Sequence, residues 1–503
     1  MDRSSRIAKN TLALYVRSFA ILLISLYTSR VFLKVLGVVD YGIYNVVGGI
    51  IAMLGFLNSS MQSAFQRYYN YELGKGNETK VKELFGASLG VQVLLIIIII
   101  VLSETVGLWL LDSKLTIPTE RVYAAKWVYQ VSILSFCLTT FSAPFGAIIT
   151  AYEKMHVYAI ISIVDAVLRL IIVFVLNFVQ YDKLIVYSVL LLFIGILNLL
   201  VYWIYCKIHI KVASLKFNWN LSDIKTLTSF SGWTITGTLA YTLKSQGINI
   251  LLNIFFSPVI NAARGISYQI LGAVNQFITS FQTAFRPQLT QSYASGNYDY
   301  MRKLYYSGSK ISYYLIYTIS LPIILETGTI LHLWLGDNVP EFTISFTRII
   351  LLTAFVSAFA NPTTGVVYAT GRIKTFSICI STLNLMIVPV AYVFLKMGYG
   401  PLSAMVVSFV ITVLVQIARL YYASKVANLN IKEYLRKVIL PVSIYSVLTL
   451  SLPLMSYRLM EDGLLRLLLV CFLSFTSSCL FVLLIGLEKY EKELIYKKLK
   501  ISK

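Results

Sequence analysis

Long apolar segments recur from one end of the chain to the other, and they restrict the possible folds more than any other feature. The aliphatic run Val93–Leu102 and the stretch Leu464–Leu487 are two examples. Lipid offers the backbone no hydrogen-bond partner, so an isolated spanning segment of about 20 apolar residues must form a helix. Only 13% of the 503 residues are charged, against about 25% in soluble domains. The sequence therefore predicts an all-α polytopic membrane protein.

About fourteen segments are long enough to span a bilayer. They lie near residues 11–36, 42–63, 86–111, 125–150, 156–179, 184–207, 228–256, 260–284, 307–333, 344–370, 374–396, 400–423, 438–457 and 463–486. The first follows three basic residues, as a secretory signal would, but it is longer than the roughly 7 to 15 residues of a signal core. We interpret it as the first transmembrane helix.

Basic residues gather at alternate ends of these helices. If the N-terminus is cytoplasmic, the inner segments hold the clusters Arg3, Arg6 and Lys9; Arg67, Lys75, Lys80 and Lys82; Lys207, Lys211, Lys216 and Lys225; Arg302, Lys303 and Lys310; Arg372 and Lys374; Lys425, Lys432, Arg436 and Lys437; and Lys489, Lys492, Lys497, Lys498, Lys500 and Lys503. The outer turns hold only isolated basic residues. This asymmetry predicts that both termini are cytoplasmic. It also explains most of the net charge of +21 without a nucleic-acid partner.

A weak internal repeat divides the chain. Gln62, Ala64, Phe65, Gly76, Asn77 and Leu84 recur 220 residues later, and Phe141, Pro144, Ala151 and Lys154 correspond to Phe359, Pro362, Ala369 and Arg372, 218 residues later. We predict two six-helix lobes, 1–220 and 221–430, related by a pseudo-two-fold axis along the membrane normal. Residues 431–503 would add helices 13 and 14 and a basic cytoplasmic tail.

No catalytic or cofactor motif stands out. The five cysteines and three histidines have no metal-ligand or redox spacing. The chain also contains no G-x-x-x-x-G-K-[ST] loop that would hold nucleotide phosphates. We therefore expect no enzyme activity, no metal and no cofactor.

Cations inside the predicted helices are the strongest functional signal. An ionised side chain at the bilayer centre costs about 2.5 to 3.5 kcal/mol on insertion scales, so it normally faces a partner or a wet cavity. Arg17 and Arg30 lie in the first helix, Lys244 in the seventh and Arg264 near the start of the eighth. Arg30 is near the outer end, where its side chain can also reach the interface. We predict that these residues bind an anionic substrate.

The seventh predicted helix is also unusually polar. Besides Lys244 it carries Ser229, Ser231, Thr234, Thr236, Thr238, Tyr241, Thr242, Ser245, Gln246 and Asn249. Polar groups on more than one face suit a hydrated cavity rather than lipid. Arginine can bind phosphate through two parallel hydrogen bonds, while hydroxyls and amides such as Gln246 and Asn249 can bind a sugar. These features predict a cavity for an anionic, hydroxylated substrate.

Two further pairs of residues stand out. Asp165 and Arg169 are four residues apart in the fifth helix, so we expect a structural ion pair on one helix face. Pro144 and Pro362 occupy equivalent repeat positions near the ends of helices 4 and 10. Because proline removes a helical hydrogen bond, we predict matching hinges there, with a static packing kink as the alternative.

The stretch Leu36–Val47 contains the pattern L-G-x-x-x-Y-G, formed by Leu36, Gly37, Tyr41 and Gly42. With the helix number and the repeat, it resembles the polysaccharide (O-antigen repeat unit) flippases of the multidrug/oligosaccharidyl-lipid/polysaccharide superfamily, which are MATE-like transporters. The resemblance covers essentially the whole chain. It implies translocation of an undecaprenyl-pyrophosphate-linked oligosaccharide across the bacterial inner membrane, for O-antigen or capsule synthesis. The implied partners are this anionic lipid-linked substrate, membrane lipids and other polysaccharide assembly proteins.

Three alternatives remain at this point. A cation-coupled multidrug exporter would share the fold, but such exporters typically use acidic lumen residues. The acids within the apolar segments here are Glu104, Asp165 and Glu326, and none lies in helix 1 or helix 7. A flippase for the peptidoglycan lipid precursor is a close sibling. A membrane-embedded glycosyltransferase or polymerase would usually show a large outer loop or an acidic catalytic motif.

Overall fold

The computed structural model describes residues 3–152, 154–370 and 374–487, without the side chains of residues 3–16, 74, 229–238 and scattered positions between 280 and 294. Every regular element in these ranges is helical, which confirms the predicted all-α class. The chain forms two compact units, Met1–Ala262 and Ala263–Lys503. Arg372 and the predicted basic tail from Lys489 onward lie outside the described residues.

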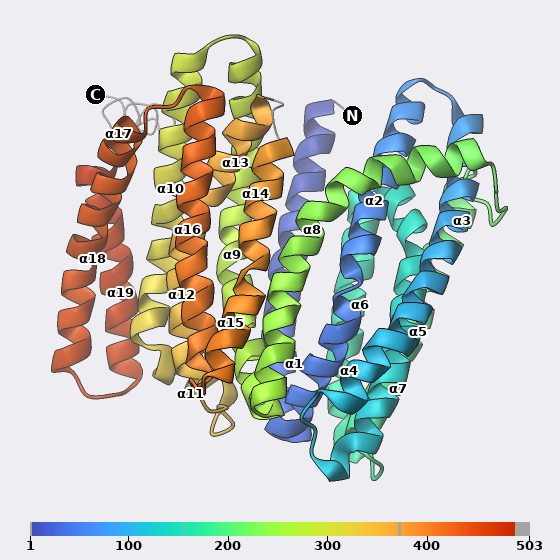
Figure 1. Ribbon diagram of the computed structural model, residues 1–503, viewed down its shortest axis with the longest axis horizontal. Helices are drawn as coiled ribbons and strands as arrows, with labels where there is room; N and C mark the ends of the chain where they lie inside the picture. Colours follow the sequence, from blue (N-terminus) through green and yellow to red (C-terminus); the bar gives the residue numbers. More distant parts are fainter. Residues whose placement is uncertain (1–2, 153, 371–373, 488–503) are drawn as a thin grey trace. The chain divides into compact units, whose positions relative to one another are not determined.

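The helices of the first unit run side by side (Figure 1). They are α1 (Arg3–Ala52), α2 (Gly55–Gly74), α3 (Glu78–Leu102), α4 (Leu108–Ser113), α5 (Val122–Ala151), α6 (Met155–Val175), α7 (Lys183–His209) and α8 (Leu221–Phe255). A π-helical turn at Ser103–Gly107 joins α3 to α4. α1 contains two predicted segments because Gly37, with φ of 84°, interrupts its helical backbone.

The second unit contains the rest of the helices. They are α9 (Pro258–Ala294), which begins at the end of the first unit, α10 (Tyr298–Leu325), α11 (Thr327–Leu335), α12 (Thr343–Ser357), α13 (Ala360–Ala369), α14 (Lys374–Leu385), α15 (Ile387–Lys396), α16 (Leu402–Ala427), α17 (Ile431–Tyr434), α18 (Leu440–Leu459) and α19 (Leu464–Phe481). Several predicted segments are thus broken once along their length, as α12 and α13 are at Ala358 and Phe359.

The described residues contain ten helices that are long and apolar enough to cross a membrane. The pair α10 and α11, bent by 78°, would be an eleventh span. α8 and α9 both contain undescribed side chains, so the predicted total of about fourteen stays a prediction. The chain is a multi-pass membrane protein.

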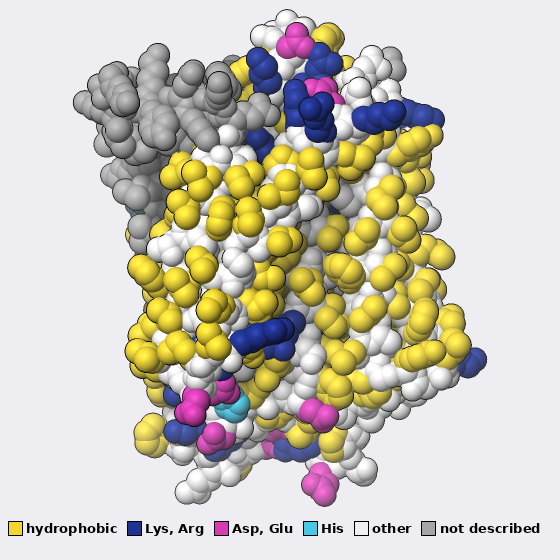
Figure 2. All heavy atoms as spheres, turned by 90° about the vertical axis from the view of Figure 1, so that its left-hand side faces the viewer, with side chains coloured by type: hydrophobic (Ala, Val, Ile, Leu, Met, Phe, Trp, Pro, Cys, Tyr) yellow, Lys and Arg dark blue, Asp and Glu magenta, His cyan; other side chains and the backbone are white. Residues whose placement is uncertain are grey.

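The outer surfaces of the helices suit a bilayer. On one face of the molecule, hydrophobic side chains cover most of the height, and charged side chains gather mainly toward the two ends (Figure 2). α18 and α19 expose large apolar residues, including Val447, Met455, Leu465 and Phe472. Because water would penalise such a surface, hydrocarbon is its natural surrounding.

The boundary between the compact units differs from the boundary that the internal sequence repeat predicts. The first compact unit extends to Ala262, and α8 packs against α1, α2 and α3 within it. The predicted lobes, 1–220 and 221–430, come instead from the internal repeat, with 431–503 as an addition. Compact units and repeats need not coincide, so the lobe boundaries stay a prediction.

Candidate functional site

Arg17 is held against an aromatic ring on a neighbouring helix. Its guanidinium carbon lies 4.8 Å from the centroid of the Tyr158 ring of α6, which is a cation–π distance. Its Nε is buried and has no hydrogen-bond partner among the described residues. A buried donor without a partner costs free energy, and a cation within an apolar helix adds to that cost. The position therefore suits an anionic acceptor.

Arg30 belongs to an exposed stripe of α1. Phe19, Leu23, Tyr27 and Arg30 are all exposed, and their spacing of three or four residues places them on one helix face. The first three would meet apolar groups, while Arg30 would meet an anionic or aqueous one. Such a surface matches an amphipathic, anionic ligand.

The predicted site residues of α8 differ in accessibility. Lys244 and Gln246 are half-buried, and Asn249 is buried. A Cβ atom at Gly49 of α1 would lie 2.8 Å from Oε1 of Gln246 and 2.9 Å from Nδ2 of Asn249, so α1 and α8 approach closely there. The side chains at 229–238, which include Ser229, Ser231, Thr234, Thr236 and Thr238, lie outside the described part.

Asn249 is also part of a buried asparagine network. Its Nδ2 donates to the Asn45 carbonyl at 3.2 Å, and its Oδ1 accepts from Nδ2 of Asn261 at 2.9 Å. Nδ2 of Asn253 donates to Oδ1 of Asn261 at 3.1 Å, and Oδ1 of Asn253 accepts from the Thr116 backbone N–H at 2.8 Å. These bonds fasten the end of α8 to its neighbours, so a substrate contact by Asn249 would require them to open.

Arg264 lies in the second compact unit, near the start of α9. It is buried, and its guanidinium carbon is 4.3 Å from the Tyr268 ring centroid. Arg17, Arg30 and Lys244 belong to the first unit. The predicted joint binding of one anion by Arg17, Lys244 and Arg264 therefore stays a proposal.

Asp165 and Arg169 form an ion pair on α6. Nε of Arg169 donates to Oδ2 of Asp165 at 2.8 Å, and Nδ2 of Asn198 on α7 donates to Oδ1 of the same carboxylate at 2.6 Å. Both carboxylate oxygens are thus occupied. The pair connects two helices, as a structural role would require.

The two prolines of the predicted hinges have different local structures. Pro144 is buried inside α5, which continues without a break on both sides. Pro362 is buried in the first turn of α13, just after the break that separates α12 from α13. Proline fits a first helical turn without losing a hydrogen bond, whereas an interior proline removes one. The predicted hinge role stays a proposal.

The L-G-x-x-x-Y-G pattern has a structural explanation. Gly37 adopts a positive φ, which costs a side-chain-bearing residue strain. A Cβ atom at Gly42 would lie 1.9 Å from the carbonyl oxygen of Pro258 at the start of α9. Tyr41 is buried, with its ring centroid 5.4 Å from that of Phe32. The pattern therefore forms a tight turn between the first two predicted helices.

Arg121 gathers two carboxylates close to this turn. Its Nε and Nη2 donate to the two oxygens of Asp40 at 2.8 and 2.6 Å, and its Nη1 donates to Asp182 at 2.5 Å. Burial alone would raise the pKa of Asp182, but the bonds from Arg121 and from the backbone N–H groups of Ile185 and Leu184 bring that pKa below its usual value. Sequence reasoning missed this cluster because its members are 61 and 81 residues apart.

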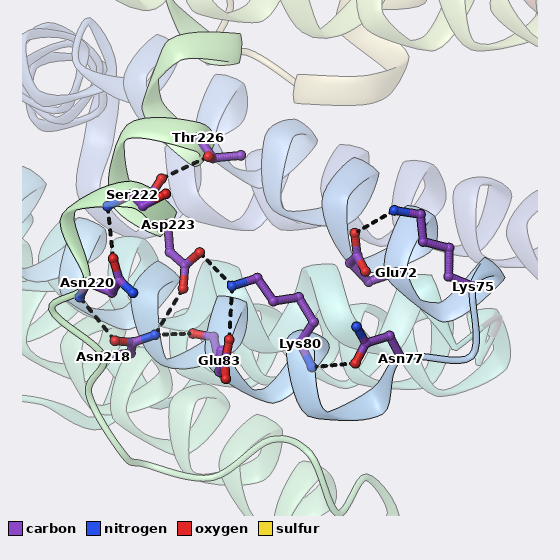
Figure 3. Close-up of polar contacts among 10 residues, drawn as sticks. All are labelled: Glu72, Lys75, Asn77, Lys80, Glu83, Asn218, Asn220, Ser222, Asp223 and Thr226. Atoms are coloured by element: carbon purple, nitrogen blue, oxygen red, sulfur yellow. Dashed lines mark hydrogen bonds and ion pairs between the residues drawn. The ribbon is translucent and has the colours of Figure 1, made fainter.

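A second polar cluster fixes the start of α8 to α3 (Figure 3). Nζ of Lys80 lies 2.8 Å from Oδ1 of Asp223 and 2.9 Å from Oε2 of Glu83. Nδ2 of Asn218 donates to Oδ2 of Asp223 and to the Glu83 carbonyl, both at 3.2 Å. Asn220 caps α8 by accepting the Ser222 N–H at 3.0 Å. The helix that carries Lys244 therefore begins at a fixed point of the first unit.

The second unit contains a buried ion pair that sequence reasoning also missed. Nε and Nη2 of Arg466 donate to the two carboxylate oxygens of Glu326 at 2.7 and 2.9 Å. Nearby, Nε of Arg348 donates to the Ile324 carbonyl at 3.0 Å, close to the end of α10. The only available signal was that Glu326 and Arg466 both lie near predicted outer helix ends. The pair joins α19 to the bend between α10 and α11.

No group of three or more His, Cys, Asp or Glu side chains in the described ranges could hold a metal ion. The arrangement offers cations, amides and aromatic rings. These groups suit an anion, and the described side chains among them include no recognisable pair of nucleophile and base.

Comparisons with known proteins identify the fold. A family model described as "Polysaccharide biosynthesis protein" matches residues 7–293, and a search of curated proteins gives no significant match. The lipid II flippase MurJ, in an inward closed conformation, aligns with a TM-score of 0.75 and 14% identity over 96% of this chain and 99% of its own. An inward-facing multidrug resistance MATE family transporter of the MOP superfamily aligns with a TM-score of 0.63 and 15% identity, over 82% and 94%. A MOP superfamily transporter from Pyrococcus furiosus aligns with a TM-score of 0.58 and 14% identity, over 84% and 96%.

Proposed function

This chain belongs to the polysaccharide biosynthesis protein family, and from that membership we propose that it is a flippase for an undecaprenyl-pyrophosphate-linked oligosaccharide repeat unit. It would work by alternating access in the bacterial inner membrane, with both termini cytoplasmic, and supply O-antigen or capsule synthesis. The MATE-like fold supports a transporter. The family match supports a polysaccharide precursor as its cargo.

The observation that carries the proposal is the state of Arg17. A buried guanidinium Nε without a described hydrogen-bond partner, in a membrane-spanning helix, needs a compensating anion or water. A pyrophosphate supplies several acceptor oxygens, and arginine can bind two of them in parallel. The exposed apolar residues of the α1 stripe would then lie beside the prenyl chain.

The state of the acids argues against a cation-coupled drug exporter. Asp165 is bonded to Arg169, Glu326 is bonded to Arg466, and Glu104 accepts a hydrogen bond from Gln130 at 3.3 Å. A carboxylate already paired with an arginine is a poor site for a transported cation or proton, and Glu104, which has no such pair among the described residues, lies outside α1 and α8. A peptidoglycan-precursor flippase remains the nearest alternative, because its substrate also carries a pyrophosphate.

Complementation of flippase-null strains tests the proposal. We expect Arg17→Ala and Lys244→Ala to abolish surface polysaccharide and Arg17→Lys to retain part of it, because charge at these positions matters more than shape. Arg458→Ala, which changes an exposed arginine at the end of α18, is the matched control and should leave function intact. Membrane abundance of each variant is measured by immunoblot.

Two outcomes would contradict the proposal. Full activity of both alanine variants at normal abundance would remove these cations from the substrate site. Rescue of a strain lacking its peptidoglycan-precursor flippase, without rescue of surface polysaccharide, would assign the chain to the alternative substrate.

A further inference from the structure

The connection between α7 and α8, residues 210–220, lies along α3 at the edge of the first unit (Figure 1). Gly86 of α3 allows the close approach of the connection's backbone, and Gly90 lies at ordinary contact distance from one of the connection's side chains. A Cβ atom at Gly86 would lie 2.5 Å from the Lys216 carbonyl oxygen, and one at Gly90 would lie 3.4 Å from the Trp219 ring. The backbone of this connection is therefore seated directly on the helix.

Hydrogen bonds hold both the connection and the start of α8 in this position. Asn218 donates to Asp223 and to the Glu83 carbonyl, and Lys80 bonds to both acids (Figure 3). Asp223 is only 4% exposed. A buried carboxylate that accepts two such bonds is fully committed, so the connection is a fixed element of the unit.

Although its backbone is fixed, the connection presents large apolar side chains outward. Leu215 and Phe217 are each 46% exposed, Trp219 is 55% exposed and Leu221 is 79% exposed. The Phe217 and Trp219 rings are stacked, with centroids 6.2 Å apart and an interplanar angle of 13°. Exposed apolar clusters of this kind normally mark a surface that is covered in the working protein.

Positive charge surrounds these apolar side chains. Lys211, Lys216 and Lys225 are exposed, and none of them forms an ion pair with a residue that the structure describes. The two nearby acids, Glu83 and Asp223, are both bound to Lys80. Lys80 offsets one of these two negative charges, and the three exposed lysines outweigh the other, so the local surface is apolar and cationic.

We propose that residues 210–225, which we name the interface loop, bind anionic phospholipids at the leaflet where α3 and α8 begin. Phe217 and Trp219 lie at the level where head groups meet acyl chains, since aromatic rings favour that layer. The three lysines contact phosphate groups, as basic residues beside membrane helices do. With the proposed orientation of the chain, this is the cytoplasmic leaflet.

The interface loop would also position a helix of the proposed site. α8 begins within the interface loop at Leu221, and Lys244 lies about 23 residues further along this helix. A loop bound both to α3 and to lipid head groups holds the start of α8 at a constant depth. Movement of α8 during transport would then occur beyond this anchored end.

The test uses the full-length protein in nanodiscs of phosphatidylcholine, alone or mixed with phosphatidylglycerol. Phosphatidylglycerol binding is measured by native mass spectrometry for the wild type and for the triple variant Lys211→Gln, Lys216→Gln and Lys225→Gln. We expect the association constant to fall about fivefold for each lysine removed. The matched variant with arginine at all three positions keeps the charge and should bind as the wild type does.

Tryptophan quenching tests the depth of the loop. The signal lost in Trp219→Phe identifies the contribution of Trp219 among the six tryptophans of the chain. We expect nitroxide-labelled lipid to quench that contribution and aqueous iodide to leave it largely unchanged. Both measurements are independent of transport and of orientation, so they can fail while the proposed flippase function holds.

Either of two results would overturn the inference. Unchanged phosphatidylglycerol binding in the glutamine variant would show that the lysines do not contact head groups. Efficient quenching of Trp219 by iodide, without quenching by lipid nitroxide, would show that the loop faces water. In that case a protein partner or a second copy of the chain would be the occupant to test.

Discussion

Gly42 allows two parts of the first unit to approach more closely than any side chain would permit. A Cβ atom there would lie 1.9 Å from the carbonyl oxygen of Pro258 and 2.9 Å from its Cβ. The obstacle is mainly backbone, which cannot move aside as a flexible side chain can. We therefore expect Gly42→Ala to force the turn at the end of α8 away from α1 and to destabilise the fold.

Gly48 provides a matched control in the same helix, because a Cβ atom there would meet nothing within 4 Å. Replacing glycine by alanine inside a helix stabilises it by roughly 0.5 to 1 kcal/mol, and both substitutions share this gain. The difference between the unfolding free energies of the two variants therefore measures the cost of the clash at Gly42. Overpacking of this kind typically costs about 1 to 3 kcal/mol, so Gly42→Ala should be less stable than Gly48→Ala by that amount.

The assay is urea unfolding of each purified variant in detergent micelles, followed by intrinsic tryptophan fluorescence. The unfolding free energies of Gly42→Ala and Gly48→Ala are compared at equal protein and detergent concentrations. Equal values for the two variants would refute the reasoning, because they would show that α1 and the start of α9 do not approach each other as the structure has them.

Other predictions concern the ion pairs and the prolines. Because the carboxylate of Glu326 is fully buried, Glu326→Gln should cost up to about 3 to 5 kcal/mol of unfolding free energy, since Arg466 would keep only the exposed carboxylate of Asp462 as an ionic partner. Replacing Glu326 and Arg466 by methionine should recover much of this loss, and an equal or larger loss in the double variant would contradict a pairing effect. The pKa of Asp182 is lowered in the fold, so the ionised carboxylate contributes to the unfolding free energy above its unfolded pKa of about 3.9, and this contribution is lost as pH falls below that value. The difference in unfolding free energy between wild type and Asp182→Asn should therefore shrink below about pH 4. A difference that stays constant down to pH 2 would be inconsistent with this linkage. Pro144→Ala and Pro362→Ala should slow transport at unchanged membrane abundance if these residues are hinges, and unchanged transport in both variants would exclude that role.

Part of the fold could be read from the sequence because the bilayer imposes it. Apolar length predicted the all-helical class, and the L-G-x-x-x-Y-G pattern marked the turn at Gly37 and Gly42 and pointed to the family. The spacing of Asp165 and Arg169 also located an ion pair, since residues four apart share a helix face. These inferences use local periodicity only, which does not require knowledge of neighbouring helices.

The candidate site could be predicted only as a set of cations at particular depths. The sequence placed Arg17 inside a helix, but only the structure showed its contact with Tyr158 and its unpartnered Nε. Conversely, Asn249 was predicted to bind substrate, and the structure shows its amide already bonded within the first unit.

The apolar side chains of its long segments are enough to show that this chain is helical and lies in a membrane, because the polar backbone groups of such segments find no hydrogen-bond partner in hydrocarbon. Which polar groups of different helices meet was visible only in the folded molecule. Glu326 and Arg466 are 140 residues apart. Gly42 lies close to Pro258, although most of the sequence of the first unit separates them. No periodicity relates such positions, because helical spacing specifies which face a residue occupies but not which helix will pack against that face.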